Sequence, residues 1–355
     1  MTELSFEDSK ILVIGGAGFV GSNLVLSLLE KKPSQITIVD NLISSEKENV
    51  PEGSTVNFIN ASINNDGILT ALEDDIDFVF HLSCFHGNQS SIANPLLDHE
   101  NNTLTSLKLF DRLSSFQNIK KVVYAAAACA VAEKTYDSPT ATTEDQPISL
   151  FHDSPYSISK IIGELYGNYY FQRYELPFVK ARFSNVYGPR EILGAGQWRG
   201  TVHTVWRNVI PTFIWKALNG ESLPLDNGGN ASRDFIFVQD MAEGLMKCAL
   251  KGTPGDIYNL ATGKETSILD LAKIINELTE NEAPLDMKPA RDWDKSGKRF
   301  ASTQKSETEL GFNSKISIQD GIFKTVEWTR ENFDFIKNCI QKHQLEMEKL
   351  TKVEK

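Results

Sequence analysis

The sequence predicts an α/β protein with a doubly wound parallel sheet and a smaller C-terminal lobe that is discontinuous in the chain. Three observations support this prediction. Short apolar runs alternate with amphipathic stretches through the first half of the chain. The apolar runs are continuous, as in parallel strands that helices bury on both faces. A glycine-rich segment at 15–21 joins the first apolar run to the first amphipathic stretch.

The first half supplies the predicted sheet and its covering helices. Continuous apolar runs predict strands at 10–14, 35–39, 56–59, 78–82, 121–125 and 178–183. Apolar residues at helical spacing predict helices at 19–31, 96–116 and 153–174. Pro155 stands in the first turn of the last helix, where its missing N–H costs no hydrogen bond.

The second half of the chain is less regular. Its patterns predict helices at 208–218, 240–250, 267–276, 303–310 and 318–333, short strands at 235–238 and 257–260, and a turn at 226–229. Residues 187–200 are rich in glycine, proline and arginine, which is typical of a functional loop. Residues 335–355 are charged and predict a helix that frays at its end.

Composition narrows the class of protein. The 355 residues suffice for a large core and two lobes. A formal net charge of −11 argues against a nucleic-acid partner, and an anionic substrate would need local arginines to hold it. The first residues are polar and no apolar run is long enough to span a bilayer, so we expect neither a signal peptide nor a membrane partner.

Cysteine and histidine positions predict no metal site. The four cysteines are widely spaced and form no CxxC pair, which favours a reducing, cytoplasmic location. His81, His86 and His99 do not stand at ligand spacing, so packed or surface positions are the simpler interpretation.

The segment GGAGFVG at 15–21 follows a predicted strand and opens a predicted helix. Small residues let the backbone approach a pyrophosphate, whose charge the helix N-terminus stabilises. Asp40 ends the next strand, 19 residues after Gly21, at the spacing of an acid that binds ribose hydroxyls. A carboxylate there repels a 2′-phosphate, so the pattern predicts a Rossmann-type NAD site rather than an NADP site. A tight strand–helix turn without a ligand is the alternative.

Tyr156 and Lys160 stand four residues apart at the start of the predicted helix 153–174, and therefore on one helical face. A nearby ammonium favours the phenolate and lowers the pKa of a tyrosine, which suits a general acid or base acting on a sugar hydroxyl. Alone, the pattern is common and fits a half-buried tyrosine beside a solvated lysine. Downstream of a dinucleotide motif, the functional interpretation is the stronger one.

Several motifs in order now give a resemblance to a known family. They are GGAGFVGS at 15–22, DNL at 40–42, HLS at 81–83, YSISK at 156–160, RFSNVYGP at 182–189 and RDFIFV at 233–238. From residue 10 to about residue 328, the chain resembles the extended short-chain dehydrogenase/reductases of the nucleotide-sugar epimerase/dehydratase family, of the UDP-glucose 4-epimerase type.

The resemblance implies NAD as the cofactor and assigns residues to it. The glycines would hold the pyrophosphate, Asp40 and Asn41 the adenosine ribose, and Lys160 the nicotinamide ribose. Asn102 matches a structural, water-ordering position. The full implied set is Gly15, Gly18, Phe19, Val20, Gly21, Asp40, Asn41, Leu42, Ser62, Ile63, Leu82, Ser83, Cys84, Asn102, Ala125, Tyr156, Lys160, Ser184 and Val186.

The resemblance also implies a nucleotide-diphosphate sugar, most simply a UDP-sugar, as substrate. Asn185 would bind the diphosphate, and Arg233 a phosphate, a task that suits a planar guanidinium. A surface ion pair is the alternative for each arginine. Trp198 could close over the sugar or belong to a packed loop. The full implied set is His86, Asn185, Trp198, Asn208, Arg233 and Arg291.

Two departures from the family pattern stand out. The family has a Ser or Thr that bonds the sugar 4-hydroxyl, where this chain has Ala127. A methyl group neither donates nor accepts, and the thiol of Cys129 is a weak substitute. The same segment lacks the Asp-Glu pair of the 4,6-dehydratases. Second, the pair Ser62-Ile63 replaces the usual Asp-Ile beside the adenine.

These observations favour a 4-epimerase that oxidises the sugar transiently at C4, with Tyr156 as acid/base. Dehydration or decarboxylation through the same keto sugar is the alternative, and Ala127 also motivates a catalytically weak NAD-binding regulatory protein. The family pairs helices such as 96–116 and 153–174 into a four-helix bundle, so a homodimer is expected. Polysaccharide biosynthesis is the expected role.

The motifs also predict how the chain divides. We expect residues 1–183 and 234–262 to form the NAD-binding domain and residues 184–233 and 263–345 to form the nucleotide-sugar lobe. Residues 346–355 would be a charged tail.

Overall fold

The computed structural model describes residues 4–132, 135–290 and 297–353, and it confirms the α/β fold. A seven-stranded sheet has the order β11-β6-β5-β4-β1-β2-β3, and every pairing in it is parallel. Its strands are β1 (Lys10–Ile14), β2 (Gln35–Asp40), β3 (Val56–Asn60), β4 (Phe78–His81), β5 (Lys121–Ala127), β6 (Phe178–Phe183) and β11 (Ile257–Leu260). The order runs outward from β1 in both directions, as in a doubly wound sheet.

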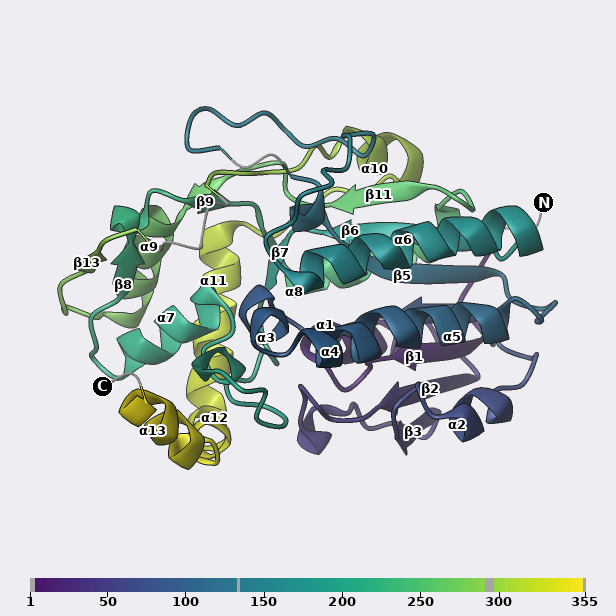
Figure 1. The fold of residues 1–355 in the computed structure, drawn as a ribbon, viewed down its shortest axis with the longest axis horizontal. Helices are drawn as coiled ribbons and strands as arrows, with labels where there is room; N and C mark the ends of the chain where they lie inside the picture. Colours follow the sequence, from purple (N-terminus) through teal and green to yellow (C-terminus); the bar gives the residue numbers. More distant parts are fainter. Residues whose placement is uncertain (1–3, 133–134, 291–296, 354–355) are drawn as a thin grey trace.

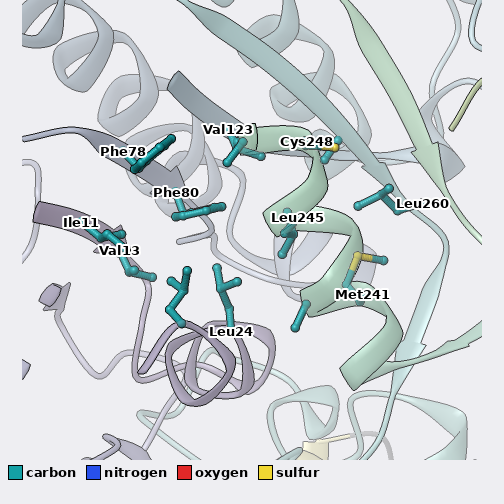
Figure 2. Close-up of a cluster of buried hydrophobic side chains, with 14 of the residues drawn as sticks. Ile11, Val13, Leu24, Phe78, Phe80, Val123, Met241, Leu245, Cys248 and Leu260 are labelled. Carbon is teal, nitrogen blue, oxygen red and sulfur yellow. The ribbon is translucent and has the colours of Figure 1, made fainter. Parts of the chain in front are cut away.

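Helices cover both faces of this sheet. Figure 1 shows α5 (Thr105–Leu113) and α6 (Pro155–Tyr174) side by side over one face. On the other face, α1 (Phe19–Leu29) packs against α8 (Val238–Lys251). Figure 2 shows Leu24 of α1 and Leu245 of α8 meeting Phe80 of β4 in one apolar core. The continuous apolar strands predicted this double burial.

The predicted helix 96–116 is interrupted, which corrects the expectation of one regular helix. The structure has α4 (Pro95–Asp98), a π-helical stretch (His99–Leu104) and then α5, with two further helices before them, α2 (Asp66–Ala71) and α3 (Asn88–Ala93). The buried side chain of Asn102, inside the π-helical stretch, accepts a hydrogen bond from the backbone N–H of Phe85 at 2.7 Å. Such π-helical turns often accompany functional sites.

A smaller lobe lies beside the sheet and has its own core, at the side away from the N-terminus in Figure 1. It is assembled from separate stretches of chain, while α8, β11 and α10 (Gln304–Leu310) return to the large sheet. The elements of the lobe are α7 (Val209–Leu218), β8 (Pro224–Asp226), β9 (Ser232–Arg233), β12 (Thr266–Ser267), α9 (Ile268–Thr279), β13 (Asp286–Lys288) and α11 (Ile318–Glu331). A short parallel pair joins β7 (Asn185–Tyr187) to β10 (Phe235–Phe237). Four 3₁₀ turns are also described, at 47–49, 128–130, 202–204 and 227–229.

The C-terminal segment forms two helices rather than the one predicted over 335–355. They are α12 (Phe333–Gln341) and α13 (Gln344–Val353). Phe333 stacks on Trp215 of α7, with ring centroids 4.4 Å apart, so α12 is held by the smaller lobe. Among the helices described, none is long and apolar enough to cross a membrane.

Candidate active site

A cavity of about 470 Å³ lies at the carboxyl edge of the large sheet. Residues at the ends of β1, β2, β5 and β6 line it, and residues of the 187–208 segment and the smaller lobe complete its wall. Ligands of open parallel sheets bind at this edge, because the strands deliver their loops and helix N-termini there.

The glycine turn forms one end of the cavity. Gly15 has a φ of +84°, and a Cβ at Gly21 would lie 2.1 Å from the carbonyl oxygen of Gly15. No side chain fits at either position, so the start of α1 approaches the end of β1 closely. The N-cap Gly18 places no side chain over the first turn, and no acidic residue stands in that turn. The backbone N–H groups at this turn therefore suit a pyrophosphate.

Asp40 ends β2, is 9% exposed and lines the same end of the cavity. Its Oδ2 accepts from the backbone N–H of Ala17 at 3.0 Å, and its Oδ1 accepts from Leu42 N–H at 2.9 Å and from Ser45 Oγ at 3.0 Å. Burial raises the pKa of this carboxyl, while these hydrogen bonds oppose the rise. Asp40 thus braces the glycine turn in addition to the ribose role predicted for it.

The structure brings together most residues predicted to bind the cofactor. Leu42 and Asn102 are not in the cavity lining. The backbone N–H of Leu42 donates to Asp40. Asn102 accepts from the backbone of Phe85 in the 82–86 segment, and its amide nitrogen donates to Asp98 at 2.7 Å. The predicted residues that do line the cavity are Gly15, Gly18, Phe19, Val20, Gly21, Asp40, Asn41, Ser62, Ile63, Leu82, Ser83, Cys84, Ala125, Tyr156, Lys160, Ser184 and Val186.

Tyr156 and Lys160 enter the cavity from the first turns of α6. Ser154 caps this helix by accepting from the backbone N–H of Ser157 at 3.3 Å. The buried ammonium of Lys160 lies 5.8 Å from the centroid of the Tyr156 ring and donates to the carbonyl of Ala125 at 2.9 Å. This geometry sets a fixed cation beside a phenol, which stabilises the phenolate form.

Ala127 is the last residue of β5, and it places a methyl group at the cavity wall. With Ala130 and Ile161 it forms a small apolar cluster against which Tyr156 packs. The wall next to Tyr156 is therefore apolar at the position where the family pattern has a hydroxyl. The side chain of Cys129 lies outside the described part of the structure.

The residues predicted to bind the substrate divide into three groups. His86, Asn185, Asn208 and Arg233 line the cavity. Trp198 is not in the lining, and its ring centroid lies 5.8 Å from that of His343. Arg291 lies outside the described residues. Arg233 donates through Nη1 to the carbonyl of Gly297 at 2.6 Å.

Further charged residues of the wall were not singled out from the sequence. Arg207 donates to the carbonyls of Thr204 at 2.9 Å and Ser44 at 2.7 Å, and burial lowers its pKa to about 9. Burial raises the pKa of Glu191 to about 7. Arg190 and Arg299 also line the cavity. The polar, arginine-rich 187–200 segment was the only sequence signal for part of this group.

A glycine turn at a helix N-terminus, an acidic residue at the end of the second strand and a Tyr–Lys pair in one cavity define a dinucleotide-dependent enzyme site. The model of the NAD dependent epimerase/dehydratase family matches residues 11–261, and the chain belongs to this family. The family uses NAD, and the glycine turn and Asp40 fit that cofactor.

Relatives cover nearly the whole chain. A putative UDP-glucose 4-epimerase of Methanocaldococcus jannaschii is 31% identical over 91% of this chain and 99% of its own. A dTDP-D-glucose 4,6-dehydratase of Bos taurus is 28% identical over 93% of this chain and 91% of its own. Both reactions therefore occur among the curated relatives.

Solved structures are similar to this chain in fold. The enzyme WbmF of Bordetella bronchiseptica, in complex with NAD+ and UDP, is 55% identical with a TM-score of 0.88, over 97% of this chain and 99% of its own. The UDP-glucose 4-epimerase of Thermotoga maritima with UDP-glucose is 28% identical with a TM-score of 0.81, over 91% of this chain and 99% of its own.

The position of Asp40 leads to a prediction about cofactor affinity. Asp40→Asn replaces the carboxylate with a neutral amide and weakens the charge-assisted hydrogen bond predicted to the adenosine ribose. We therefore expect the Kd for NADH to rise about tenfold. The increase is measured by fluorescence titration, with the exposed Asp66→Asn as control. An unchanged affinity in a stably folded Asp40→Asn protein would exclude Asp40 from the cofactor site.

Proposed function

We propose that this protein is an NAD-dependent nucleotide-sugar 4-epimerase, with a UDP-sugar as substrate. One observation carries the proposal: a single cavity is lined by the glycine turn, by the Tyr156–Lys160 pair, and by Arg233 and Asn185. A cofactor and a sugar diphosphate can therefore meet at the phenol. The similarity to epimerases, and to a structure holding both NAD+ and UDP, supports this assignment.

The residues have separate tasks in the proposed reaction. Bound NAD supplies the acceptor for the hydride from C4 of the sugar. The ammonium of Lys160 stabilises Tyr156 as the phenolate, and the phenolate Oη takes the proton of the 4-hydroxyl to become a neutral phenol. Arg233 and Asn185 hold the diphosphate, so the keto sugar stays tethered while it turns its other face. The small side chains of the four alanines at 125–128 line the cavity and leave room for that rotation.

A dehydratase is the second candidate, because dTDP-glucose 4,6-dehydratases are among the relatives. Dehydration needs an acid and a base at C6 and C5 in addition to Tyr156. Residues 125–132 read AAAACAVA and carry no carboxylate where the dehydratases have their Asp-Glu pair. This difference favours epimerisation. The further alternatives are a decarboxylase and a weakly active regulatory protein, in which Ala127 leaves the sugar without the usual hydroxyl partner.

The first test of the proposal is a panel of UDP-, dTDP-, GDP- and CDP-sugars, with product analysis by NMR and mass spectrometry. We expect a C4 epimer of unchanged mass from a UDP-sugar. Tyr156→Phe should lower kcat at least 10²-fold while NADH binding is retained, since only the acid/base is lost. Tyr166→Phe, outside the cavity, serves as the matched control. Loss of one water from the product would indicate the dehydratase, and no turnover would favour the regulatory protein.

We also propose a homodimer in which α5 and α6 of two copies pack together. Leu165 and Tyr169 of α6 are 55% and 50% exposed, and Leu96 of α4 is 82% exposed. Such large apolar side chains at one surface are typical of an interface. Contact of these side chains with a second copy would pack α6, which carries Tyr156 and Lys160, into a helical bundle between the two cavities.

The dimer is tested by size-exclusion chromatography with light scattering. We expect twice the chain mass of 39.6 kDa for the native protein and a shift to monomer for Leu165→Glu. Glu substitution at Leu345, which is 71% exposed on α13, is the control and should leave the mass unchanged. A monomeric native protein would refute the proposed interface.

A further inference from the structure

One segment, residues 191–199, separates the cavity from the C-terminal helices. Glu191, Ile192 and Ala195 of this segment line the cavity. Ile192 and Ala195 also belong to one buried apolar cluster with Cys339 of α12. The segment is therefore a single layer of chain, with the cavity on one side and α12 on the other.

Two glycines let this segment approach its neighbours at backbone distance. Gly194 has a φ of +70°, and a Cβ there would lie 2.5 Å from the carbonyl oxygen of Cys339 in α12. Gly196 has a φ of +82°, and a Cβ there would lie 2.3 Å from the carbonyl oxygen of Ile43. Neither position accommodates a side chain. The segment is thus fitted closely between α12 and the loop that follows β2.

Hydrogen bonds join the segment to that loop, residues 41–46. The backbone N–H of Gly196 donates to Oε1 of Glu46 at 2.7 Å, and the backbone N–H of Gln197 donates to the carbonyl of Ile43 at 3.0 Å. The loop and the segment therefore form one continuous wall, which closes the cavity beside the end of β2.

Two residues between α12 and α13 hold this wall from outside. His343 is 5% exposed, and its Nε2 donates to the carbonyl of Gly194 at 2.9 Å. Burial lowers the pKa of His343, so at neutral pH the imidazole carries one N–H, and this bond uses it. Lys342 forms an ion pair with Glu46, the same carboxylate that accepts from Gly196. One residue thus contacts the segment, and the other contacts the loop.

The hydrogen bonds continue from the loop to the residues that fit NAD. Ser45 donates through Oγ to Asp40 at 3.0 Å, and Asp40 accepts from the backbone N–H of Ala17 in the glycine turn. The loop itself lines the cavity next to Asp40, at the end that suits the adenosine half of the dinucleotide. A displacement of the loop would therefore change the surroundings of the cofactor directly.

We propose that the junction of α12 and α13 is part of the cofactor site, with His343 and Lys342 as positioning residues that hold segment 191–199 and the 41–46 loop together over the adenosine half of NAD. The adenosine half leaves the cavity when these contacts open, so the contacts slow cofactor release. The inference concerns the cofactor alone and holds for any of the sugar reactions considered above.

The test measures the release of NADH from the full-length protein, by stopped-flow fluorescence after mixing with excess NAD+. His343→Ala should release NADH about tenfold faster than the native protein, the size of one buried hydrogen bond. Lys342→Ala should release it roughly two- to fourfold faster, because its ion pair is partly exposed. His343→Gln, whose amide nitrogen can donate to the same carbonyl, should restore slow release.

Two exposed neighbours on α13 supply the controls, and UDP supplies an independent readout. Gln344→Ala and Lys349→Ala should release NADH at the native rate. The Kd for UDP, measured by calorimetry, should be the same in the native protein and in His343→Ala, because a positioning role at the adenosine end leaves the rest of the cavity unchanged.

Three results would overturn the proposal. The first is a native release rate in both His343→Ala and Lys342→Ala. The second is an equal weakening of NADH and UDP binding in His343→Ala without recovery in His343→Gln, since that pattern indicates a general loss of structure. If His343→Ala does not fold, a native release rate in Lys342→Ala is by itself the third. A protein that turns over no sugar nucleotide would refute the proposed function and leave this measurement intact.

Discussion

The parallel direction of the seven strands is the constraint on which the site depends. Because β1, β2, β4, β5 and β6 all run the same way, their carboxyl ends meet at one edge. The glycine turn begins directly after β1, and the 82–86 segment begins directly after β4. Asp40 and Ala127 are the last residues of β2 and β5. Double burial by α1, α8, α5 and α6 makes this arrangement rigid, since each strand is packed on both faces.

The charge of the cavity differs from that of the whole chain. The protein carries a net charge of −11, whereas five cations and four carboxylate residues line the cavity. The cations are Lys160, Arg190, Arg207, Arg233 and Arg299, and the carboxylate residues are Asp40, Asp153, Glu191 and Asp234. Lys160 is buried and the four arginines are half-buried, so each acts on an anion more strongly than a fully exposed cation would. A dinucleotide and a sugar diphosphate are both polyanions, so these cations suit the two ligands of the proposed reaction.

Features with a local physical cause could be predicted from the sequence. The glycines at 15–21 and Asp40 followed from their spacing, and Tyr156 and Lys160 from one helical face. The π-helical stretch around Asn102 could not be predicted, because nothing in the local pattern marks it and the hydrogen bond of Asn102 is to Phe85, outside that stretch. The Glu191–Asn208 bond also joins residues of an irregular loop and a helix start. For Trp198 the sequence left two interpretations open, a lid over the sugar and a packed loop, because the choice depends on a contact with His343, which is distant in the sequence.

The central claim is that one cavity oxidises a sugar at C4 and returns the same hydride to the opposite face. It is tested most directly with a UDP-sugar that carries deuterium at C4. The account predicts a C4 epimer that keeps its deuterium at C4 and takes none from deuterated solvent. Deuterium found at C6, or lost to solvent, would contradict the account, because the first outcome requires dehydration and the second requires proton abstraction from carbon.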